Sequence, residues 1–321
     1  MNDEIKVSII CNAFNHEPFI RDALEGFVTQ KTNFSYEVLV HDDASTDGTA
    51  AIIQAYAQKY PTLIRPICQE ENQFSKGVRI TRTFQLPRAK GKYIALCEGD
   101  DYWTDPLKLQ KQYDFMESNP DYSLCTCSTV FLDVSTGQMQ TKYQITENRD
   151  FTAEELILEE KGRAFQYATF FIKTDVFRQS PRWITTFPVG DYPLSINAAL
   201  NGRVRMLADT MTVYRFGTAG SWTANLRRDT ERAARISRRM IQGLQELDAD
   251  TQGRYHTVIQ QRIRLNQYES ALRNRDWKAL KSDELRPIYR SKSFSTRMKH
   301  QFSCRVPRVY DAVNRMLKGS K

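Results

Sequence analysis

Short apolar runs alternate with amphipathic segments through the first 120 residues of the chain. Runs with the length of a buried strand lie at residues 7–14, 36–43, 63–69 and 92–99. Segments with apolar residues at helical spacing lie at residues 17–30, 45–60 and 105–120. In the last segment we expect Asp105 as N-cap and Pro106 as the first helical residue. This order predicts an α/β fold with a doubly wound, mostly parallel sheet, whose ligands bind beyond the carboxyl ends of the strands.

The pattern changes after residue 122. Residues 122–133 and 165–177 are typical of strands, and no regular helix separates them. We therefore expect a mixed or antiparallel continuation of the same sheet. Residues 189–202 predict a further helix, and long segments from residue 225 onward have helical spacing with few breakers. The chain is expected to divide into a domain of residues 1–224 and a mainly helical extension of residues 225–321.

Charge is divided unevenly between these two parts. The extension carries 23 Lys and Arg against 10 Asp and Glu, which leaves 23 and 28 for residues 1–224. A basic helical extension can pack within the protein, form a homodimer or dock on an anionic membrane surface. Residues 294–319 mix basic and apolar side chains, as interfacial helices do. The extension shows no motif that reads nucleic acid, so no nucleic-acid partner is expected.

Composition indicates a folded protein without a membrane span. Apolar residues make up 40% of the chain and aromatic residues 11%, which excludes a disordered protein. No run approaches the roughly 18 apolar residues of a membrane helix. The start, "MNDEIKVSII", does not resemble a secretory signal. The six scattered cysteines predict reduced, buried thiols rather than disulfides or a zinc site. We expect a cytoplasmic location, peripheral at the inner face of the membrane if the extension docks there.

Two acidic clusters follow predicted strands. Asp42 and Asp43 end the run at 36–43, and Glu98 and Asp100 lie in "EGDD" after the run that begins at Lys92. A carboxylate at such an end can accept a hydrogen bond from a base N–H. Carboxylates together with phosphate oxygens also suit Mg²⁺ or Mn²⁺. The alternative is that these side chains only cap the helices that follow them.

Four segments in order resemble inverting family-2 glycosyltransferases with the GT-A fold. They are "VSIICNAFNHEPFIRDALEGFVTQ", "YEVLVHDDASTDGT", "AKGKYIALCEGDDYWTDPLKLQKQYDF" and "VGDYPLSI", and the similarity spans roughly residues 5–218. Several motifs in the same order are far more specific than any one of them.

The resemblance implies a set of donor-binding residues. The nucleotide would lie against Asn12, Ala13, Phe14, Asn15, Asp42, Asp43, Arg82, Glu98, Gly99 and Asp100. Within this set an Asp of the 42–43 pair would read uracil, and Asp100 would bind the metal ion. The chain departs from the family at Asn12, Ala13 and Phe14, where Pro, Thr and Tyr are usual. For Arg82 the alternative is a surface charge on a basic loop.

The resemblance also places the catalytic base at Asp191, which would take a proton from the acceptor hydroxyl. The alternative is that Asp191 serves only as a helix N-cap. Many family members carry a His where this chain has Gly217. In place of that His, Arg215, Ser221 or Trp222 would contact the diphosphate or the acceptor, or the metal ion would rely on Asp100 and water alone. Tyr102 and Trp103 are either an aromatic platform for a sugar or core packing.

These expectations describe a metal-dependent inverting glycosyltransferase of the hexosyl or N-acetylhexosaminyl type. Its donor would be a nucleotide-sugar, expected to be a UDP-sugar, and its acceptor a saccharide or lipid-linked saccharide in bacterial surface polysaccharide synthesis. Two alternatives stay open. A sugar-nucleotide nucleotidyltransferase would usually show a Gly-rich basic loop, which "CNAFNHEPF" lacks. A non-catalytic scaffold that binds nucleotide or membrane would need no base.

Overall fold

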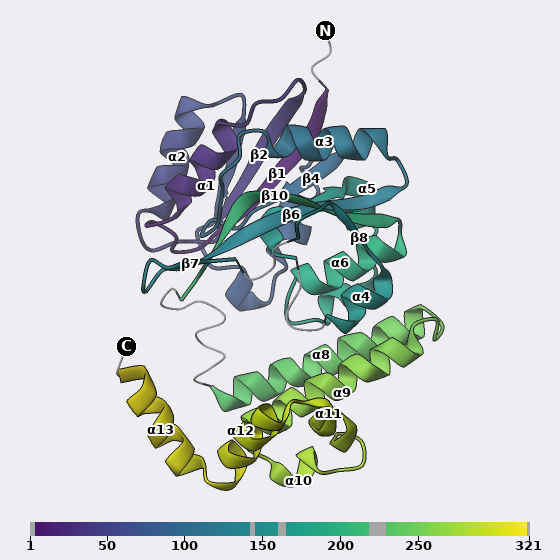
Figure 1. Cartoon of the computed structure of the whole chain (residues 1–321). Helices are drawn as coiled ribbons and strands as arrows, with labels where there is room; N and C mark the ends of the chain where they lie inside the picture. Colours follow the sequence, from purple (N-terminus) through teal and green to yellow (C-terminus); the bar gives the residue numbers. More distant parts are fainter. Residues whose placement is uncertain (1–3, 142–144, 160–164, 218–228, 320–321) are drawn as a thin grey trace. The chain divides into compact units, whose positions relative to one another are not determined.

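The computed structural model describes residues 4–141, 145–159, 165–217 and 229–319 (Figure 1). The chain forms two compact units. The first comprises Met1–Ile184 and Val189–Ala224, and the second Thr185–Pro188 and Asn225–Lys321. The second unit thus includes a short segment, Thr185–Pro188, that a simple division after residue 224 does not anticipate.

One mixed sheet forms the centre of the first unit. In spatial order its strands are β3 (Ile64–Cys68), β2 (Ser35–Asp42), β1 (Ile5–Ala13), β4 (Tyr93–Leu96), β9 (Phe171–Lys173), β6 (Tyr122–Asp133), β10 (Arg203–Phe216) and β5 (Tyr102–Trp103). Two short strands pair at the side, β7 (Met139–Gln140) with β6 and β8 (Arg149–Phe151) with β10. Strands β3, β2, β1 and β4 are parallel neighbours, as are β6 and β10, whereas β9 is antiparallel to both β4 and β6. The predicted α/β fold with a mixed later part is confirmed.

Helices cover both faces of this sheet (Figure 1). One face carries α1 (Ile20–Val28), α2 (Thr49–Lys59) and α3 (Lys108–Ser118), and the other carries α4 (Ala153–Leu158) and α6 (Asp191–Leu200). Shorter elements are η1 (Phe74–Lys76), the π-helix η2 (Thr81–Gln85), η3 (Tyr167–Thr169), α5 (Thr174–Arg178) and η4 (Arg182–Thr185). The apolar faces of α1 to α3 bury Leu24, Ile53 and Leu109 in one core cluster, which also contains alternate residues of β1 and β2. This packing fixes where the strand ends lie.

The start of α3 differs from the sequence prediction. The helix begins at Lys108, with Leu107 as N-cap and no side-chain cap, so the expectation of Asp105 as N-cap and Pro106 as first residue is wrong. Asp105 instead accepts a hydrogen bond from the Leu107 amide at 2.8 Å and pairs with Lys111 at 2.8 Å. These contacts form a turn that precedes the helix.

Residues 165–177 also differ from the expected strand. They form the 3₁₀ turn η3, the three-residue strand β9 and the helix α5. The carbonyl of Gln166 accepts hydrogen bonds from the Thr169 amide (2.9 Å) and hydroxyl (2.7 Å), which closes the turn. The apolar run of this segment reflects burial on both sides rather than a long strand.

Helices make up the second unit. They are α8 (Thr230–Asp250), α9 (His256–Arg273), α10 (Trp277–Leu280), α11 (Arg286–Ser291), α12 (Phe294–Arg305) and α13 (Pro307–Gly319). Gly243 in α8 makes room for the buried Phe187 ring, since a Cβ at this glycine would lie 2.5 Å from a ring carbon. Arg239 donates to the carbonyl of Thr186 at 3.0 Å. These contacts explain why residues 185–188 belong to this unit.

Two further expectations can be compared with the structure. All six cysteines are free thiols, and Cys11, Cys97, Cys125 and Cys127 are buried. Among the residues that the structure describes, no helix is both long and apolar enough to cross a membrane.

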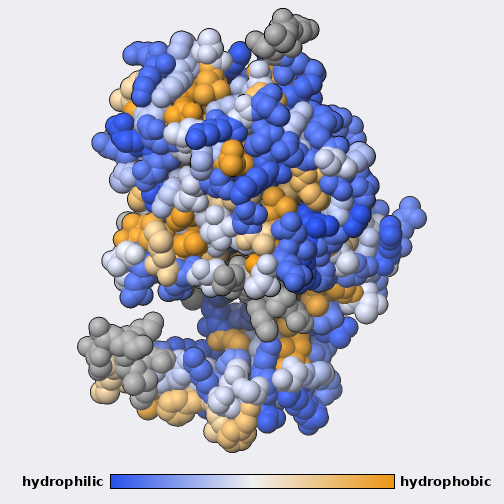
Figure 2. All heavy atoms as spheres, turned by 45° about the horizontal axis from the view of Figure 1, so that its top comes forward, coloured by the Kyte–Doolittle hydropathy of each residue, from blue (hydrophilic) through white to orange (hydrophobic). Residues whose placement is uncertain are grey.

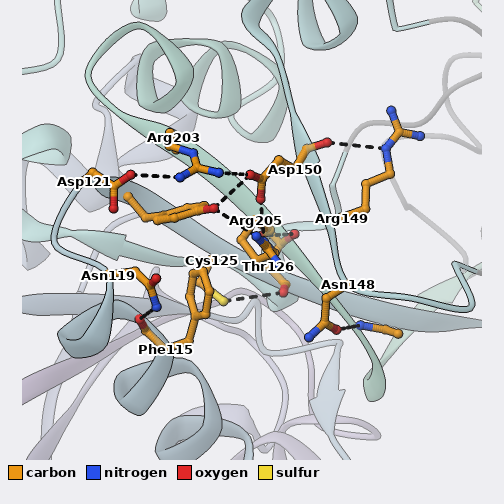
Figure 3. Close-up of polar contacts among 12 residues, drawn as sticks. Phe115, Asn119, Asp121, Cys125, Thr126, Asn148, Arg149, Asp150, Arg203 and Arg205 are labelled. Carbon is orange, nitrogen blue, oxygen red and sulfur yellow. Dashed lines mark hydrogen bonds and ion pairs between the residues drawn. The ribbon is translucent and has the colours of Figure 1, made fainter.

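An ion-pair network joins β8 to β6 and β10 (Figure 3). The carboxylate of Asp150 accepts a hydrogen bond from the Tyr122 hydroxyl at 2.8 Å and pairs with Arg203 and Arg205. Asp121 pairs with Arg203 at 3.0 Å. Burial acts to raise the pKa of Asp150, but the hydrogen bonds from Tyr122, Arg203 and Arg205 outweigh it and hold the pKa below its ordinary value. Ionised Asp150 therefore stabilises this edge of the sheet.

We expect Asp150→Asn to lower the free energy of unfolding at pH 7 by about 1–2 kcal/mol. A depressed carboxyl pKa stabilises the folded state above the unfolded-state pKa of about 3.9, and this contribution is lost as the pH falls through the folded-state pKa. The gap between variant and parent should therefore close on acidification. Urea unfolding monitored by circular dichroism from pH 3 to pH 7 measures this difference in the free energy of unfolding. Asp121→Asn, which removes one exposed partner, should cost less than about 0.5 kcal/mol; equal losses in the two variants would contradict this account.

Candidate active site

The acidic turn after β4 lies against the carboxyl end of β1. The amide of Cys97 donates to the carbonyl of Ile10 at 3.1 Å, and the amide of Gly99 donates to the carbonyl of Asn12 at 2.9 Å. A Cβ on Gly99 would lie 2.9 Å from His16 Nδ1 and 3.0 Å from the Ala13 Cβ. A residue with a side chain would therefore push the turn away from β1. The glycine of "EGDD" allows the two strand ends to meet.

Asp101 and Arg215 hold this turn in place. The buried carboxylate of Asp101 accepts a hydrogen bond from the Arg215 amide at 2.8 Å, and Arg215 Nη1 donates to the carbonyl of Asp100 at 2.9 Å. The guanidinium also pairs with Asp22 and lies 4.4 Å from the centre of the Tyr102 ring. In this structure Arg215 is a clamp on the acidic turn. The sequence missed Asp101, because spacing does not distinguish the carboxylates within such a run.

His16 faces the acidic turn from the loop after β1. Its Nε2 lies 4.0 Å from Asp100 Oδ2, and its amide donates to the Thr49 hydroxyl at 2.8 Å. His16 Nδ1 is buried and has no hydrogen-bond partner. Mg²⁺ binds its ligands at about 2.1 Å, so two ligands of one ion lie at most about 4 Å apart. Asp100 and His16 therefore fit a shared divalent cation.

A cation there would need further ligands. Within the described ranges of the chain, no three or more His, Cys, Asp or Glu side chains are grouped so that they could hold a metal ion. Phosphate oxygens and water are the ligands that Mg²⁺ usually adds to one or two carboxylates. The site thus suits a metal ion that binds together with a diphosphate.

The structure disfavours a histidine at Gly217, the position where many family members carry one. Gly217 has a φ of +85°, a left-handed conformation that residues with a side chain rarely adopt. A Cβ there would also lie 3.0 Å from the Asp133 carboxylate. A histidine at this position would be strained, whereas His16 already lies beside Asp100.

Three elements bring polar side chains toward Glu98. Burial and the charge of Asp100 raise the pKa of Glu98 to about 8; a hydrogen bond from Asn12 opposes the shift, and the charge of Asp191 adds to it. Asn12 lies in β1, Glu98 follows β4 and Asp191 begins α6. The carboxylates predicted from separate motifs are therefore close enough to act on one another. Their mutual repulsion is the condition that a bound cation relieves.

Asp191 is the first residue of α6, and Gly190 is the N-cap. The alternative that Asp191 serves as the N-cap is therefore wrong, because the N-cap is the residue before it. Its carboxylate accepts a hydrogen bond from the Tyr192 amide at 2.8 Å. Burial raises the pKa of Asp191, and this backbone hydrogen bond opposes the shift. A carboxylate with a raised pKa is a better proton acceptor than an ordinary one, which suits a general base.

Tyr167 is a site residue that the sequence did not reveal. Burial raises the pKa of its hydroxyl, the charges of Glu98 and Asp191 add to this, and a hydrogen bond with Thr81 opposes it. Thr81 also accepts a hydrogen bond from Asn12 Nδ2 at 3.0 Å. Tyr167 therefore lies near both Glu98 and Asp191. No signal marked it, because its segment was expected to be a strand.

The carboxylates of Asp42 and Asp43 both accept hydrogen bonds within the protein. Asp42 accepts from the amide and hydroxyl of Ser45 (3.1 and 2.5 Å), and Asp43 accepts from the amides of Gln73 and Phe74 (2.8 and 2.9 Å). Both side chains are buried. The helix α2 that follows has Gly48 as N-cap and no side-chain cap, so the alternative that Asp42 and Asp43 only cap this helix is wrong. A contact with uracil stays a prediction.

The segment after β1 is held by the same loop. The carbonyl of Ala13 accepts from the Asp43 amide at 2.9 Å, and Asn15, with φ of +55°, accepts from the Thr46 amide at 2.8 Å. Phe14, between them, is 44% exposed, so its ring is open to a planar ligand. Arg82 donates to the carbonyl of Ser180 at 2.7 Å. Base and ribose contacts of these residues stay predictions.

The aromatic pair after the acidic turn divides into two roles. Trp103 is 4% exposed, packs edge-on against Phe27 and donates from Nε1 to the carbonyl of Ala168 at 3.0 Å. Trp103 belongs to the core, so its assignment as an acceptor contact is corrected. Tyr102 is half-buried beneath the Arg215 guanidinium. Trp222 and Ser221 lie outside the described residues.

The raised pKa of Glu98 predicts a pH-dependent stability. A carboxyl whose pKa is higher in the folded state keeps a proton that the unfolded state has lost, so stability falls as the pH rises from about 5 to about 8. Glu98→Gln cannot ionise and lacks this fall. We expect the variant to match the parent chain near pH 5 and to exceed it by about 1–2 kcal/mol at pH 9, without divalent ions. Urea unfolding measures this difference.

Glu154→Gln is the matched control, because Glu154 is exposed and lies at α4. It should change stability by less than about 0.5 kcal/mol at every pH. A Glu98→Gln variant that is less stable than the parent at pH 9 would contradict the proposed repulsion.

Comparison with known proteins shows the family of this chain. Residues 8–180 match the sequence profile described as Glycosyl transferase family 2. An uncharacterized protein of Mycobacterium tuberculosis is 38% identical over 223 residues, which are 67% of this chain. The match spans 60% of the length of that relative. The Escherichia coli protein WfaP, named a UDP-Glc:alpha-D-GlcNAc-diphosphoundecaprenol beta-1,3-glucosyltransferase, is 29% identical over 68% of this chain and 80% of its own length.

Solved structures share the fold at lower sequence identity. TarS of S. aureus in complex with UDP-GlcNAc superposes with a TM-score of 0.58 and 18% identity, over 94% of this chain and 79% of that one. The mannosyltransferase PcManGT from Pyrobaculum calidifontis, in complex with GDP-Man and Mn²⁺, superposes with a TM-score of 0.58 and 16% identity, over 97% and 83%. The first unit thus has a GT-A-like fold, and the chain belongs to glycosyl transferase family 2.

Proposed function

We propose that this chain is an inverting glycosyltransferase that moves one sugar from a nucleotide-diphosphate sugar to a hydroxyl of a saccharide acceptor. The observation that carries the proposal is that Asp100 and Asp191, from separate elements, both lie near enough to Glu98 for their charges to raise its pKa. An acidic turn suits the donor diphosphate with its cation, and a separate carboxylate suits the acceptor hydroxyl. Family membership and the GT-A-like fold support the same reading.

Asp191 is the proposed general base. As the acceptor oxygen attacks the anomeric carbon, Asp191 takes the hydroxyl proton and the bond between that carbon and the diphosphate oxygen breaks. The electron pair of the broken bond leaves with the nucleoside diphosphate. Attack from the side opposite the leaving group inverts the anomeric centre. Burial, which raises the pKa of Asp191, makes its carboxylate more basic for this step.

Asp100 and His16 are the proposed protein ligands of Mn²⁺ or Mg²⁺, because their side-chain atoms lie 4.0 Å apart and face one another. When bound, such an ion neutralises charge on the departing diphosphate. Arg215 and Asp101 keep the turn in position for this contact. The structurally similar PcManGT forms a complex with GDP-Man and Mn²⁺, which supports a metal ion at this site.

We propose a UDP-sugar as donor and a lipid-linked saccharide as acceptor. WfaP is named for a UDP-Glc donor and a lipid-linked acceptor, and TarS forms a complex with UDP-GlcNAc, which supports this proposal. This acceptor class supports a role in bacterial surface polysaccharide synthesis. Incubation with UDP-glucose, UDP-N-acetylglucosamine, UDP-galactose and GDP-mannose, followed by assay for released nucleoside diphosphate, tests the donor. Release only from GDP-mannose would refute the uridine assignment.

We expect Asp191→Asn to lower the rate of sugar transfer by about 10²–10⁴-fold, because the amide cannot take the acceptor proton. Binding of the nucleotide to the variant should stay within about twofold of the parent. The rate is measured with the active donor under saturating substrate. Asp175→Asn is the control, since Asp175 is an exposed Asp in the first turn of α5 in the same unit. Full transfer activity in Asp191→Asn would refute the mechanism.

We expect His16→Ala to weaken Mn²⁺ binding in the presence of UDP by at least about tenfold, because one of two protein ligands is lost. Electron paramagnetic resonance of free Mn²⁺ measures this affinity without turnover. His256→Ala, which alters an exposed histidine of the second unit, should leave it unchanged. Equal Mn²⁺ affinity in His16→Ala and the parent would remove His16 from the site.

A further inference from the structure

The last two helices carry an exposed apolar stripe. Its members, each between 39% and 72% exposed, are Phe294, Met298, Phe302, Val306 and Val309. The first three recur every four residues along α12, and the next two continue the stripe into α13. Met316 of α13 is 72% exposed as well, and elsewhere among the described residues large apolar side chains with this exposure are scattered at Phe14, Phe74, Leu107 and Met139. Apolar residues, drawn in orange, are visible on the surface of the second unit in Figure 2.

The opposite side of α12 is already used for packing. His300 Nδ1 lies 2.9 Å from the Tyr268 hydroxyl, and Cys304 packs against the small core that Tyr268 and Leu280 share. The Tyr289 hydroxyl donates to the carbonyl of Arg297 at 3.4 Å. These contacts fix the rotation of the helix. The stripe faces away from the core of its own unit as a result.

Basic residues predominate in the sequence of the segment that carries the stripe. Residues 292–321 contain eight Lys and Arg and a single acidic residue, Asp311. The carboxylate of Asp311 is bound to Arg275 at 2.7 and 2.9 Å, so it is already paired. Lys299 and Arg308 are exposed beside the stripe. Large apolar side chains among basic residues are typical of helices that lie in a membrane interface.

We propose that the α12–α13 stripe docks on the surface of a phospholipid bilayer that contains anionic lipids. Phe294, Met298 and Phe302 would enter the boundary between head groups and acyl chains, while Lys299 and Arg308 contact the anionic head groups. A second copy of this chain fits less well, because the dimer would bring two strongly basic faces together. Nucleic acid would satisfy the charges and leave the apolar side chains in water.

This docking goes beyond the proposed transfer reaction. It would hold the enzyme at the membrane surface, where a lipid-linked acceptor resides. It requires neither a base at Asp191 nor a metal ion at Asp100. Release of nucleoside diphosphate from a soluble donor and attachment to vesicles can therefore fail independently of each other.

Sedimentation of the full chain with unilamellar vesicles tests the proposal. We expect binding to vesicles of 30% phosphatidylglycerol in phosphatidylcholine, and at least about tenfold weaker binding to phosphatidylcholine alone or in 1 M NaCl. Replacing Phe294, Met298 and Phe302 together by Ser should weaken binding at least about tenfold. Met139→Ser, which alters an exposed apolar residue of the first unit, is the matched control. Circular dichroism checks that each variant is folded.

A second pair of variants leaves all apolar residues intact. Lys299→Gln with Arg308→Gln should weaken binding about 25-fold, since each charge near the surface contributes about fivefold. Arg273→Gln with Lys278→Gln removes the same amount of charge from exposed positions on α9 and α10. This pair should weaken vesicle binding much less. The proposal is overturned if the parent chain does not sediment with anionic vesicles, or if both charge pairs have equal effects. The proposal is also overturned if light scattering shows that the parent chain is a dimer and the triple Ser variant a monomer.

Discussion

The repulsion among carboxylates at the end of β4 is the constraint on which the site depends. Glu98, Asp100 and Asp101 follow a buried strand, and the charge of Asp191 acts on Glu98 from the start of α6. Ionising several neighbouring carboxyl groups costs free energy where water has little access. Burial therefore raises the pKa of Glu98 and Asp191. The surrounding structure keeps the turn in position despite this cost. A nucleotide diphosphate with its cation is the ligand that would turn the repulsion into attraction.

The fold supplies the opposing contacts. Gly99 allows the turn to lie against β1, and Asp101 and Arg215 fasten it to β10 from the other side. The parallel strands β1, β2 and β4 end on the same edge of the sheet, so the residues that follow them meet there. Because α6 begins at this edge as well, a proton acceptor and an acidic turn share one site. The arrangement explains why residues far apart in sequence act together.

Sequence reasoning found the strands of the first hundred residues because each is a short apolar run with a polar end. It also brought Asp100 and Asp191 into one candidate site through motif order. It did not find Tyr167, Thr81 or His16, because their roles come from contacts between distant segments. For Trp103 it left two alternatives, an acceptor contact and core packing. The burial of Trp103 against Phe27 in the structure shows that it belongs to the core. The three-residue strand β9 was likewise hidden in a longer apolar run.

Calorimetric titration of the parent chain with UDP, with and without Mn²⁺, tests the central claim most directly. If the carboxylates at the strand ends bind a nucleotide through a cation, UDP should bind when Mn²⁺ is present. Its affinity should be at least about tenfold lower in EDTA. Equal binding under both conditions, or no binding of any nucleoside diphosphate with any divalent ion, would contradict the account.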